Sequence, residues 1–234
     1  MRLGLPFGLT LSLALCFACA NAASSFAAAP EPLHSKAVSK PASPHRSAQQ
    51  AKPEPAKPFV PLTPAEAIQK ADNYFNRTKT MIADFVQIGA DGRRSEGKVF
   101  VEKPGRLRFE YAAPATLDVI ADGTTVAVID HKVGSIQQYF IWQTPLKFLL
   151  KDHIDLAKDT KVLNVTSDPD EVAILVEDQR VFGGTSRIKL IFDPATFTLK
   201  QWQVTDPQGY ETLVSLFNQD FTTVPNPAFF QIYK

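Results

Sequence analysis

The residues that could carry out catalysis are few, and they fall at an expected turn. Asp130 and His131 are adjacent and Ser135 follows shortly after, so the side-chain types of a hydrolase triad occur together. No Gly-x-Ser-x-Gly motif, which would present a nucleophilic serine on a sharp turn, accompanies them. Asp and His are also ordinary turn residues. We therefore expect no catalytic residues and no enzymatic activity.

Residues able to bind a metal are equally sparse. Two of the four histidines, His131 and His153, lie in the region that can fold, and both cysteines, Cys16 and Cys19, fall within the first twenty residues. Two histidines without cysteines make a poor zinc site. We expect no metal, no cofactor and, once the N-terminus is removed, no disulfide.

The N-terminus has the pattern of an export signal. Arg2 supplies a positive charge, Leu3 to Ala20 is apolar but short for a membrane span, and Ala20-Asn21-Ala22 is a small-x-small cleavage site. Residues 1–22 are therefore interpreted as a signal peptide cleaved near Ala22, which predicts a periplasmic, unanchored protein. The alternative is lipidation at Cys19, which the residues preceding it fit poorly.

Residues 23–60 are rich in Ala, Pro, Ser and Lys, and they contain too few apolar residues to offset the entropy of ordering. This stretch is predicted to be a disordered tether. Its surplus of basic residues suits a solvated linker, with weak attraction to anionic lipid or peptidoglycan as the alternative. The whole chain has 25 basic and 24 acidic residues, which is not the charge balance of a nucleic-acid-binding protein.

The predicted folded domain, residues 61–234, begins with a helix. Thr63-Pro64-Ala65-Glu66 is a capping box with proline at the first helical position. Apolar residues then recur at helical spacing up to an expected end near Lys79. A second cap-plus-proline start, Thr144-Pro145, is followed by Leu146, Phe148, Leu149, Leu150, Ile154 and Leu156, which predicts a short, apolar second helix.

The remainder is predicted to be strand. Gly97 to Tyr111 (GKVFVEKPGRLRFEY) illustrates the pattern, with a turn at Lys103-Pro104-Gly105 and then apolar residues at every second position. Turn residues at short intervals predict about eleven strands in an antiparallel meander. These are Ile82–Ile88, Glu96–Glu102, Arg106–Tyr111, Thr116–Ala121, Thr125–Asp130, Ser135–Ile141, Lys161–Thr166, Glu171–Glu177, Arg187–Phe192, Thr198–Thr205 and Tyr210–Phe217.

A sheet of this size curls, because strands twist. Its concave side would be apolar. Periodicity alone leaves open whether native side chains fill that side, as in a small closed barrel, or whether two or three helices cover a hollow.

Several segments resemble the outer-membrane lipoprotein carrier family of the periplasmic LolA type. They are Ala83-Asp84-Phe85-Val86-Gln87, the stretch from Gly97 to Tyr111, Val119-Ile120-Ala121-Asp122-Gly123, Thr144-Pro145-Leu146 with Phe148-Leu149-Leu150, and Phe192-Asp193-Pro194. The resemblance extends from Leu62 to the C-terminus, and it rests on the order and spacing of these segments together.

This resemblance implies a mainly β (α+β) fold, an unclosed antiparallel β-barrel with a helical lid over a hydrophobic cavity. The cavity would hold the acyl chains of a lipoprotein released from the inner membrane by an ABC-type transporter. Delivery would follow to an outer-membrane acceptor protein or to the membrane itself, and we expect a monomer. The expected cavity residues are Phe85, Leu107, Phe109, Tyr111, Leu117, Val119, Val128, Phe140, Phe148, Leu149, Ile174, Leu190, Phe192 and Trp202.

Four residues, Lys103, Ile68, Tyr74 and Phe75, are expected to form or hold the lid. The family commonly has arginine where this chain has Lys103, and that arginine bonds carbonyl groups of the lid. Lysine keeps the charge without the planar fork of donors, so either a looser lid or a solvated turn lysine would follow.

Other functions stay open on the same scaffold. The cargo could be a hopanoid, a glycolipid or another membrane-derived lipid. The protein could also be an anchored acceptor, which the poor lipidation signal disfavours, or an adaptor whose barrel is filled.

Overall fold

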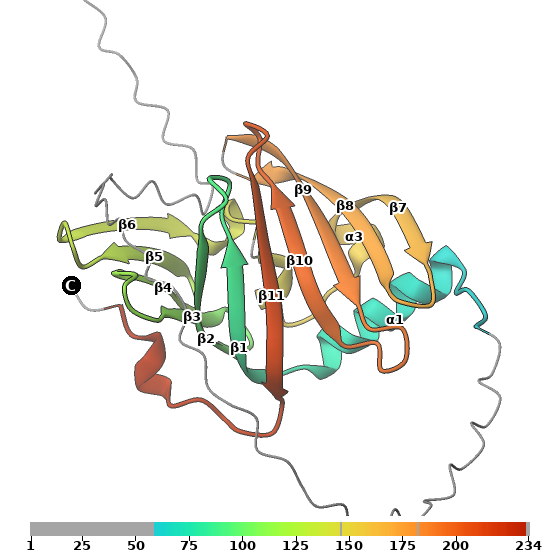
Figure 1. Ribbon diagram of the computed structural model, residues 1–234, viewed down its shortest axis with the longest axis horizontal. Coiled ribbons are helices and arrows are strands. Elements are labelled where there is room, and N and C mark those ends of the chain that lie inside the picture. Colours follow the sequence, from blue (N-terminus) through green and yellow to red (C-terminus); the bar gives the residue numbers. More distant parts are fainter. Residues whose placement is uncertain (1–58, 146, 182, 233–234) are drawn as a thin grey trace, which may run out of the picture. The chain divides into compact units, whose positions relative to one another are not determined.

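The computed structural model describes residues 59–145, 147–181 and 183–232 (Figure 1). The predicted signal peptide and nearly all of the predicted tether lie outside these residues. The first element is α1, Pro64–Arg77, and the capping box is present as expected: Thr63 Oγ1 accepts from the Glu66 amide at 3.3 Å, while Glu66 accepts from the Thr63 amide at 2.8 Å. The helix ends two residues before the expected Lys79, because Thr78 is extended.

Eleven strands form one antiparallel sheet in the order β6-β5-β4-β3-β2-β1-β11-β10-β9-β8-β7. Two meanders are joined where the first strand pairs with the last, and β6 and β7 are the two edges, so the sheet is unclosed. The bounds are β1 Thr80–Ile88, β2 Arg94–Glu102, β3 Arg106–Tyr111, β4 Leu117–Asp122, β5 Thr125–Asp130, β6 Ser135–Phe140, β7 Lys161–Ser167, β8 Val172–Val181, β9 Gly184–Phe192, β10 Leu199–Thr205 and β11 Glu211–Asp220.

The pairing register assigns every side chain to one of two faces. Directly paired residues of an antiparallel ladder point to the same side. Phe109 pairs with Val99 and Val119, and Val119 pairs with Val128, so these residues share a face, which we call the inner face. The opposite side of the sheet is the outer face. The predicted meander is therefore confirmed, with strand ends within a few residues of those expected except at the longer β8–β9 hairpin.

The sheet is strongly curled. Phe109 on β3 and Trp202 on β10 are separated by three intervening strands, yet their ring centroids are 6.3 Å apart. In a flat sheet, four strand spacings would separate the two backbones by about 19 Å. Their side chains meet because the inner face is concave, and Figure 1 shows the strands fanning around the helices accordingly.

A helical layer lies on the inner side. It comprises α1, the 3₁₀ turn Ile141–Gln143, α2 (Lys147–Leu150) and α3 (Leu156–Asp159). The prediction of a single second helix after Thr144-Pro145 is wrong, because this segment forms two short helices, α2 and α3. Asp155 caps α3 by accepting from the Lys158 amide at 3.1 Å, and Ile154 lies between the two helices.

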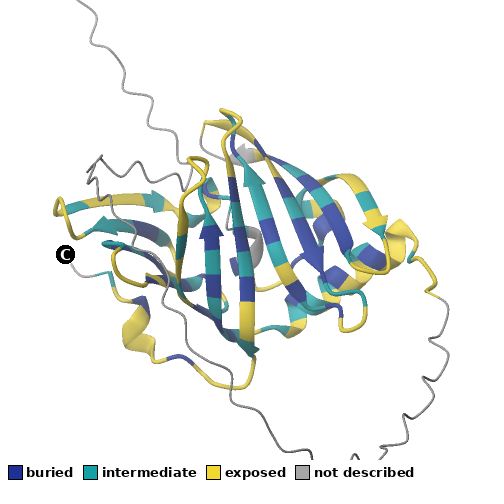
Figure 2. Cartoon of the chain, in the orientation of Figure 1, coloured by how far each residue is buried: buried dark blue, intermediate teal, exposed yellow. Residues whose placement is uncertain are grey.

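Burial follows the inner face (Figure 2). One cluster of buried residues joins α1, α3 and most of the strands. On the outer face the C-terminal turn Pro227–Phe230 packs against β3 and β4, and its Phe229 also contacts Phe100 of β2, with ring centroids 4.8 Å apart. Among the described residues, no helix combines the length and apolarity needed to cross a bilayer.

Candidate functional site

Aromatic side chains line the middle of the inner face. Phe85 contacts Phe109 and Tyr111 edge to face, each with ring centroids 5.1 Å apart, and Phe109 also contacts Trp202. Such geometry adds to the free energy gained from burial alone. Burial raises the pKa of Tyr111, whose hydroxyl donates to Gln87 Oε1 at 2.9 Å. The centre of the inner face is thus an apolar surface built from strands far apart in the sheet.

A second aromatic group joins α1 to the sheet. Tyr74 and Phe75 both meet Phe192 of β9, at centroid distances of 5.8 and 6.0 Å, and Phe197 stacks on Phe192 at 4.8 Å. Burial also raises the pKa of the Tyr74 hydroxyl. Apolar ring contacts do not require one particular partner. Another apolar group, such as a ligand, could therefore replace the side chains of α1 against this part of the sheet.

Most of the expected cavity residues do lie together on this face. The buried ones are Phe85, Leu107, Phe109, Tyr111, Leu117, Val119, Ile174, Leu190, Phe192 and Trp202, and Val128 packs against them partly buried. Ile68 and Tyr74 are partly buried in the same cluster, and Phe75 is buried. The side chains of Phe148 and Leu149 lie outside the described part of the structure.

Phe140 differs from this group. It pairs with Thr125, whereas the inner-face residue Val126 pairs with Tyr139, so Phe140 points to the outer face. It is 51% exposed and stacks on Trp142, with ring centroids 5.7 Å apart. Phe140 was expected to line the cavity, but the register of the β5–β6 hairpin places Tyr139 on the inner face instead.

Lys103 connects the β2–β3 turn to the helical layer. Its Nζ donates to the carbonyl oxygen of Phe75, in the last turn of α1, at 2.8 Å. Two residues on, the Gly105 amide donates to the Leu150 carbonyl of α2 at 2.9 Å. Burial, and secondarily the nearby charge of Lys79, lowers the pKa of Lys103 to about 8. The β2–β3 turn therefore contacts both α1 and α2.

Glycine is required at that turn. Gly105 has φ +78°, and a Cβ atom there would lie 2.7 Å from the backbone of Gly123. The close approach brings the β2–β3 and β4–β5 turns together beside α2, which sets the position from which Lys103 reaches α1.

Amide and carboxylate groups hold the helical layer together. Asn76 of α1 donates to the carbonyl of Ile154 at 2.9 Å and accepts from its amide at 2.8 Å. Asp72 Oδ1 accepts from the Leu156 amide at 2.9 Å, and burial raises the pKa of this carboxyl. These bonds satisfy the backbone groups of Ile154, between α2 and α3, and the first amide of α3, none of which has an intrahelical partner. They indicate that α1 and the segment 152–156 form one unit.

Little free space lies beneath α1. A small cavity of about 30 Å³ lies between the end of α1 and the sheet, and the residues that line it include Phe75, Lys103, Leu107 and Trp202. That volume is comparable with one water molecule. In this conformation native side chains fill the centre of the inner face.

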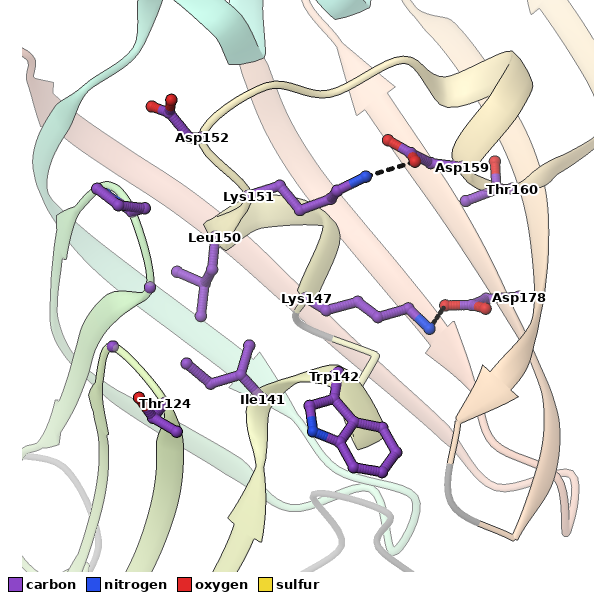
Figure 3. A pocket seen from close by; sticks show the side chains of 13 residues that line it. Thr124, Ile141, Trp142, Lys147, Leu150, Lys151, Asp152, Asp159, Thr160 and Asp178 are labelled. Atoms are coloured by element: carbon purple, nitrogen blue, oxygen red, sulfur yellow. Dashed lines mark hydrogen bonds and ion pairs between the residues drawn. The ribbon is translucent and has the colours of Figure 1, made fainter.

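A much larger pocket, about 700 Å³, adjoins α2 (Figure 3). Its apolar wall includes Ile141, Trp142 and Leu150. On the other side, Lys147 of α2 reaches across to Asp178 of β8, with Nζ and Oδ2 2.6 Å apart and both side chains largely buried. Pockets of this size are typical of small-molecule and lipid sites.

Sequence reasoning missed the polar residues of this region. Asp178 continues the inward period of Val172, Ile174 and Val176, so a carboxylate at the next inward position was a readable signal. Asn76 and Asp72 had no such signal, because their partners are backbone groups roughly eighty residues away in the sequence.

The residues considered for catalysis do not form a triad. His131 Nε2 contacts Asp118 Oδ2 at 3.2 Å, and Asp130 Oδ1 accepts from Thr116 Oγ1 at 3.0 Å and from the Lys132 amide. The hydrogen bond from that amide lowers the pKa of Asp130. Within residues 59–145, 147–181 and 183–232, no group of three or more His, Cys, Asp or Glu could hold a metal ion.

Comparison with known proteins supports the resemblance to the outer-membrane lipoprotein carrier family. Residues 76–233 match the family model described as "Outer membrane lipoprotein carrier protein LolA". An outer-membrane lipoprotein carrier protein of Chromobacterium violaceum is 24% identical over 173 residues, covering 71% of this chain and 82% of that protein. An uncharacterized protein of Rickettsia prowazekii is 22% identical over 165 residues, covering 68% of this chain and 76% of that protein.

Solved structures match the chain at lower similarity. A LolA superfamily protein of Nitrosomonas europaea has a TM-score of 0.41 and 12% identity, covering 73% of this chain and 98% of that one. The MucA/MucB complex of Pseudomonas aeruginosa contains a chain with a TM-score of 0.41 and 14% identity, covering 71% of this chain and 61% of that one.

Proposed function

The chain belongs to the LolA family of outer-membrane lipoprotein carrier proteins, and from this premise we propose that it binds the acyl chains of lipoproteins released from the inner membrane and delivers them to the outer membrane. The family consists of periplasmic carriers and not of enzymes. The partners in this proposal are an acylated lipoprotein, an ABC-type transporter that releases it, and an outer-membrane acceptor protein or the membrane. The carrier acts as a monomer.

One observation carries the proposal. The inner face of an unclosed sheet is apolar and curled, and a separate helical layer covers it through ring contacts and a small set of hydrogen bonds. A cover that packs through exchangeable aromatic contacts suits a binding face that is alternately filled by native side chains and by a ligand.

The energetics fit a carrier. An acyl chain of about sixteen carbons gains roughly 12 kcal/mol when it is removed from water, at ~0.8 kcal/mol per methylene. A membrane offers a similar gain, so transfer in either direction is close to balance and partners determine its direction. Without cargo, the apolar face needs a cover, because a large exposed apolar patch promotes aggregation.

Loading then requires the helical layer to move. The space beneath α1 is about 30 Å³, far too small for an alkyl chain, whereas the pocket beside α2 is about 700 Å³. We envisage α1 and the segment 152–156 moving away as one lid, with the bond between Lys103 and Phe75 broken on opening. Cargo would bind the open state and shift the population toward it.

Native mass spectrometry of the protein purified from the periplasm tests the identity of the cargo. Co-purified acylated lipoprotein is the expected result. A hopanoid or glycolipid in its place would replace the proposed cargo on the same scaffold, and a protein that carries nothing and binds no synthetic lipopeptide would overturn the carrier function.

Hydrogen exchange tests the lid. Amides of α1 should exchange faster when a synthetic lipopeptide is bound, because the helix has left the inner face. Amides in the centre of β1 and β2 provide the internal control and should stay equally protected. Equal protection of α1 with and without lipopeptide would contradict lid opening.

A further inference from the structure

Five neighbouring strands change from apolar to polar at the same end of the inner face. On β8, Val172, Ile174 and Val176 are followed at the next inward position by Asp178, and on β9, Ile188 gives way to Ser186. Figure 1 shows that the β1–β2, β8–β9 and β10–β11 hairpins lie at this end. The five residues, which we call the polar row, are Gln87, Thr212, Asp206, Ser186 and Asp178.

The polar row is buried. Each member is at most 6% exposed, and together they include all but one of the buried polar residues in the described part of the chain, the exception being Thr144. Polar groups removed from water destabilise a fold unless they are hydrogen-bonded. Gln87 accepts from Tyr111 and Asp178 pairs with Lys147, so these members have structural partners, but Ser186 at a fully buried position could be replaced by an apolar residue without orphaning a described partner.

Two atoms in the row have no partner among the described residues. They are Ser186 Oγ and Asp206 Oδ2, while Asp206 Oδ1 accepts from the amides of Gln208 and Tyr210 at 2.9 and 2.8 Å. Thr205 of β10 pairs with Arg187 of β9. Because the strands are antiparallel, Asp206, which follows Thr205, lies beside Ser186, which precedes Arg187. A carboxylate oxygen and a hydroxyl, both buried and without a described partner, therefore lie close together.

The large pocket reaches one member of this row, Asp178. Asp178 lines the 700 Å³ pocket and is the direct partner of Ser186 in the β8–β9 ladder. Figure 3 shows Lys147 meeting Asp178 on the opposite side of the pocket from the apolar Leu150 and Ile141. A molecule in the pocket would contact the apolar wall and reach Asp178 at one end, and the rest of the polar row continues from Asp178 through its ladder partner Ser186.

We propose that the polar row is a head-group subsite that binds hydrogen-bond donors, an amide N–H or an ammonium group, at the polar end of an acylated ligand. The inference rests on the proposed carrier function and specifies which end of the cargo is recognised. Lys147 balances the charge of Asp178, but no described cation pairs with Asp206, so the subsite accepts donors and repels an anionic phosphate. An acylated N-terminal cysteine supplies such donors, whereas an anionic phospholipid does not.

The test compares two probes in the full-length protein. One is a synthetic peptide whose N-terminal cysteine carries a diacylglyceryl group; the other is the methyl ester of the same fatty acid, which has no donor. Their affinities are measured by displacement of a fluorescent apolar probe. The variant combines Ser186→Ala with Asp206→Asn, which keeps an oxygen acceptor for the turn amides of Gln208 and Tyr210. Ser215→Ala, on the outer face of β11, is the matched control.

The variant should bind the lipopeptide about tenfold more weakly, as expected for lost hydrogen bonds to a charged acceptor, and the methyl ester unchanged. The control should bind both like the wild type. If the wild type binds the lipopeptide and the variant binds it equally well, or loses both probes equally, the head-group subsite is overturned while the carrier function stands. A wild type that binds neither probe overturns the carrier function itself. If the double variant does not fold, Ser186→Ala alone should show a smaller loss confined to the lipopeptide.

Discussion

The sheet and the helical layer of this protein are held by different kinds of contact. The sheet is continuous through eleven strands, and residues at its centre such as Phe109 and Leu190 are completely buried. The helical layer has one helix of 14 residues and two of four, and among the described contacts its polar bonds to the sheet are few, notably those made by Lys103, Gly105 and Lys147.

Under the proposed function, this difference would divide two tasks, with the sheet binding the cargo and the helical layer controlling access to it. Long ladders make the sheet a fixed receptacle, because a strand cannot leave without breaking many backbone hydrogen bonds together. In the proposed opening, the helical layer would break a few polar bonds to the sheet and the apolar contacts of α1, and its internal contacts through Asn76 and Asp72 would keep it intact. The predictions below test whether the sheet supplies binding and the helical layer supplies control.

The largest effect is expected from a charge at the centre of the sheet. Phe109→Glu introduces a carboxylate at a position where the native side chain is completely buried. It should weaken lipopeptide binding more than about 100-fold. Binding is measured by probe displacement, and circular dichroism checks the fold. Phe217→Glu, on the outer face at a residue that is 50% exposed, is the matched control and should bind normally. A folded Phe109→Glu protein with normal uptake would contradict the assignment of the inner face.

The next effect concerns the integrity of the helical layer. Asn76→Ala removes both hydrogen bonds to the backbone of Ile154, so the free energy of unfolding should fall by about 1–3 kcal/mol. Urea denaturation measures the change. Asn73→Ala, at an exposed position of the same helix, should change stability by less than about 0.5 kcal/mol. Equal effects of the two substitutions would show that the Asn76 contacts do not stabilise the layer.

Removal of the Lys103 amine should loosen the layer with little effect on the whole fold. Lys103→Met deletes the bond to the Phe75 carbonyl but also relieves the burial of a charge, so the two effects on stability largely offset each other. Amides in the last turn of α1 should exchange several-fold faster, as measured by hydrogen exchange. Lys98→Met, which breaks an exposed pair with Asp84 on the outer face, is the control and should leave α1 unchanged.

The smallest effect is a dependence on pH. Burial and the charge of Lys79 lower the pKa of Lys103 from 10.5 to about 8, against a weaker opposing effect of Asp152. Between these values the unfolded chain binds more protons at this residue than the folded protein does, so the free energy of unfolding rises with pH across that window. Lys103→Arg stays charged throughout. The melting temperature of the wild type relative to Lys103→Arg should therefore increase from pH 8 to pH 10, and a constant difference would contradict the buried charge.

Local patterns in the sequence determined much of this protein. The capping box at Thr63, the turn at Pro104-Gly105 and the period-two residues of β3 each act over a few neighbours, and all three are found where expected. The resemblance of the spaced segments to a carrier family is likewise a property of the sequence, and the family match supports it. The apolar inner face follows from the same alternation carried through successive strands.

Only the tertiary structure decided which residues control that face. Phe140 lies on the outer face and not on the expected inner face, because the register of the hairpin determines which face each residue of an edge strand occupies. The expected second helix is divided into α2 and α3, because backbone groups of segment 152–156 form hydrogen bonds with α1, which is distant in sequence. The polar row and the bond between Lys103 and Phe75 likewise depend on which strands and turns the curl brings together, and such long-range proximity has no signature in a local pattern.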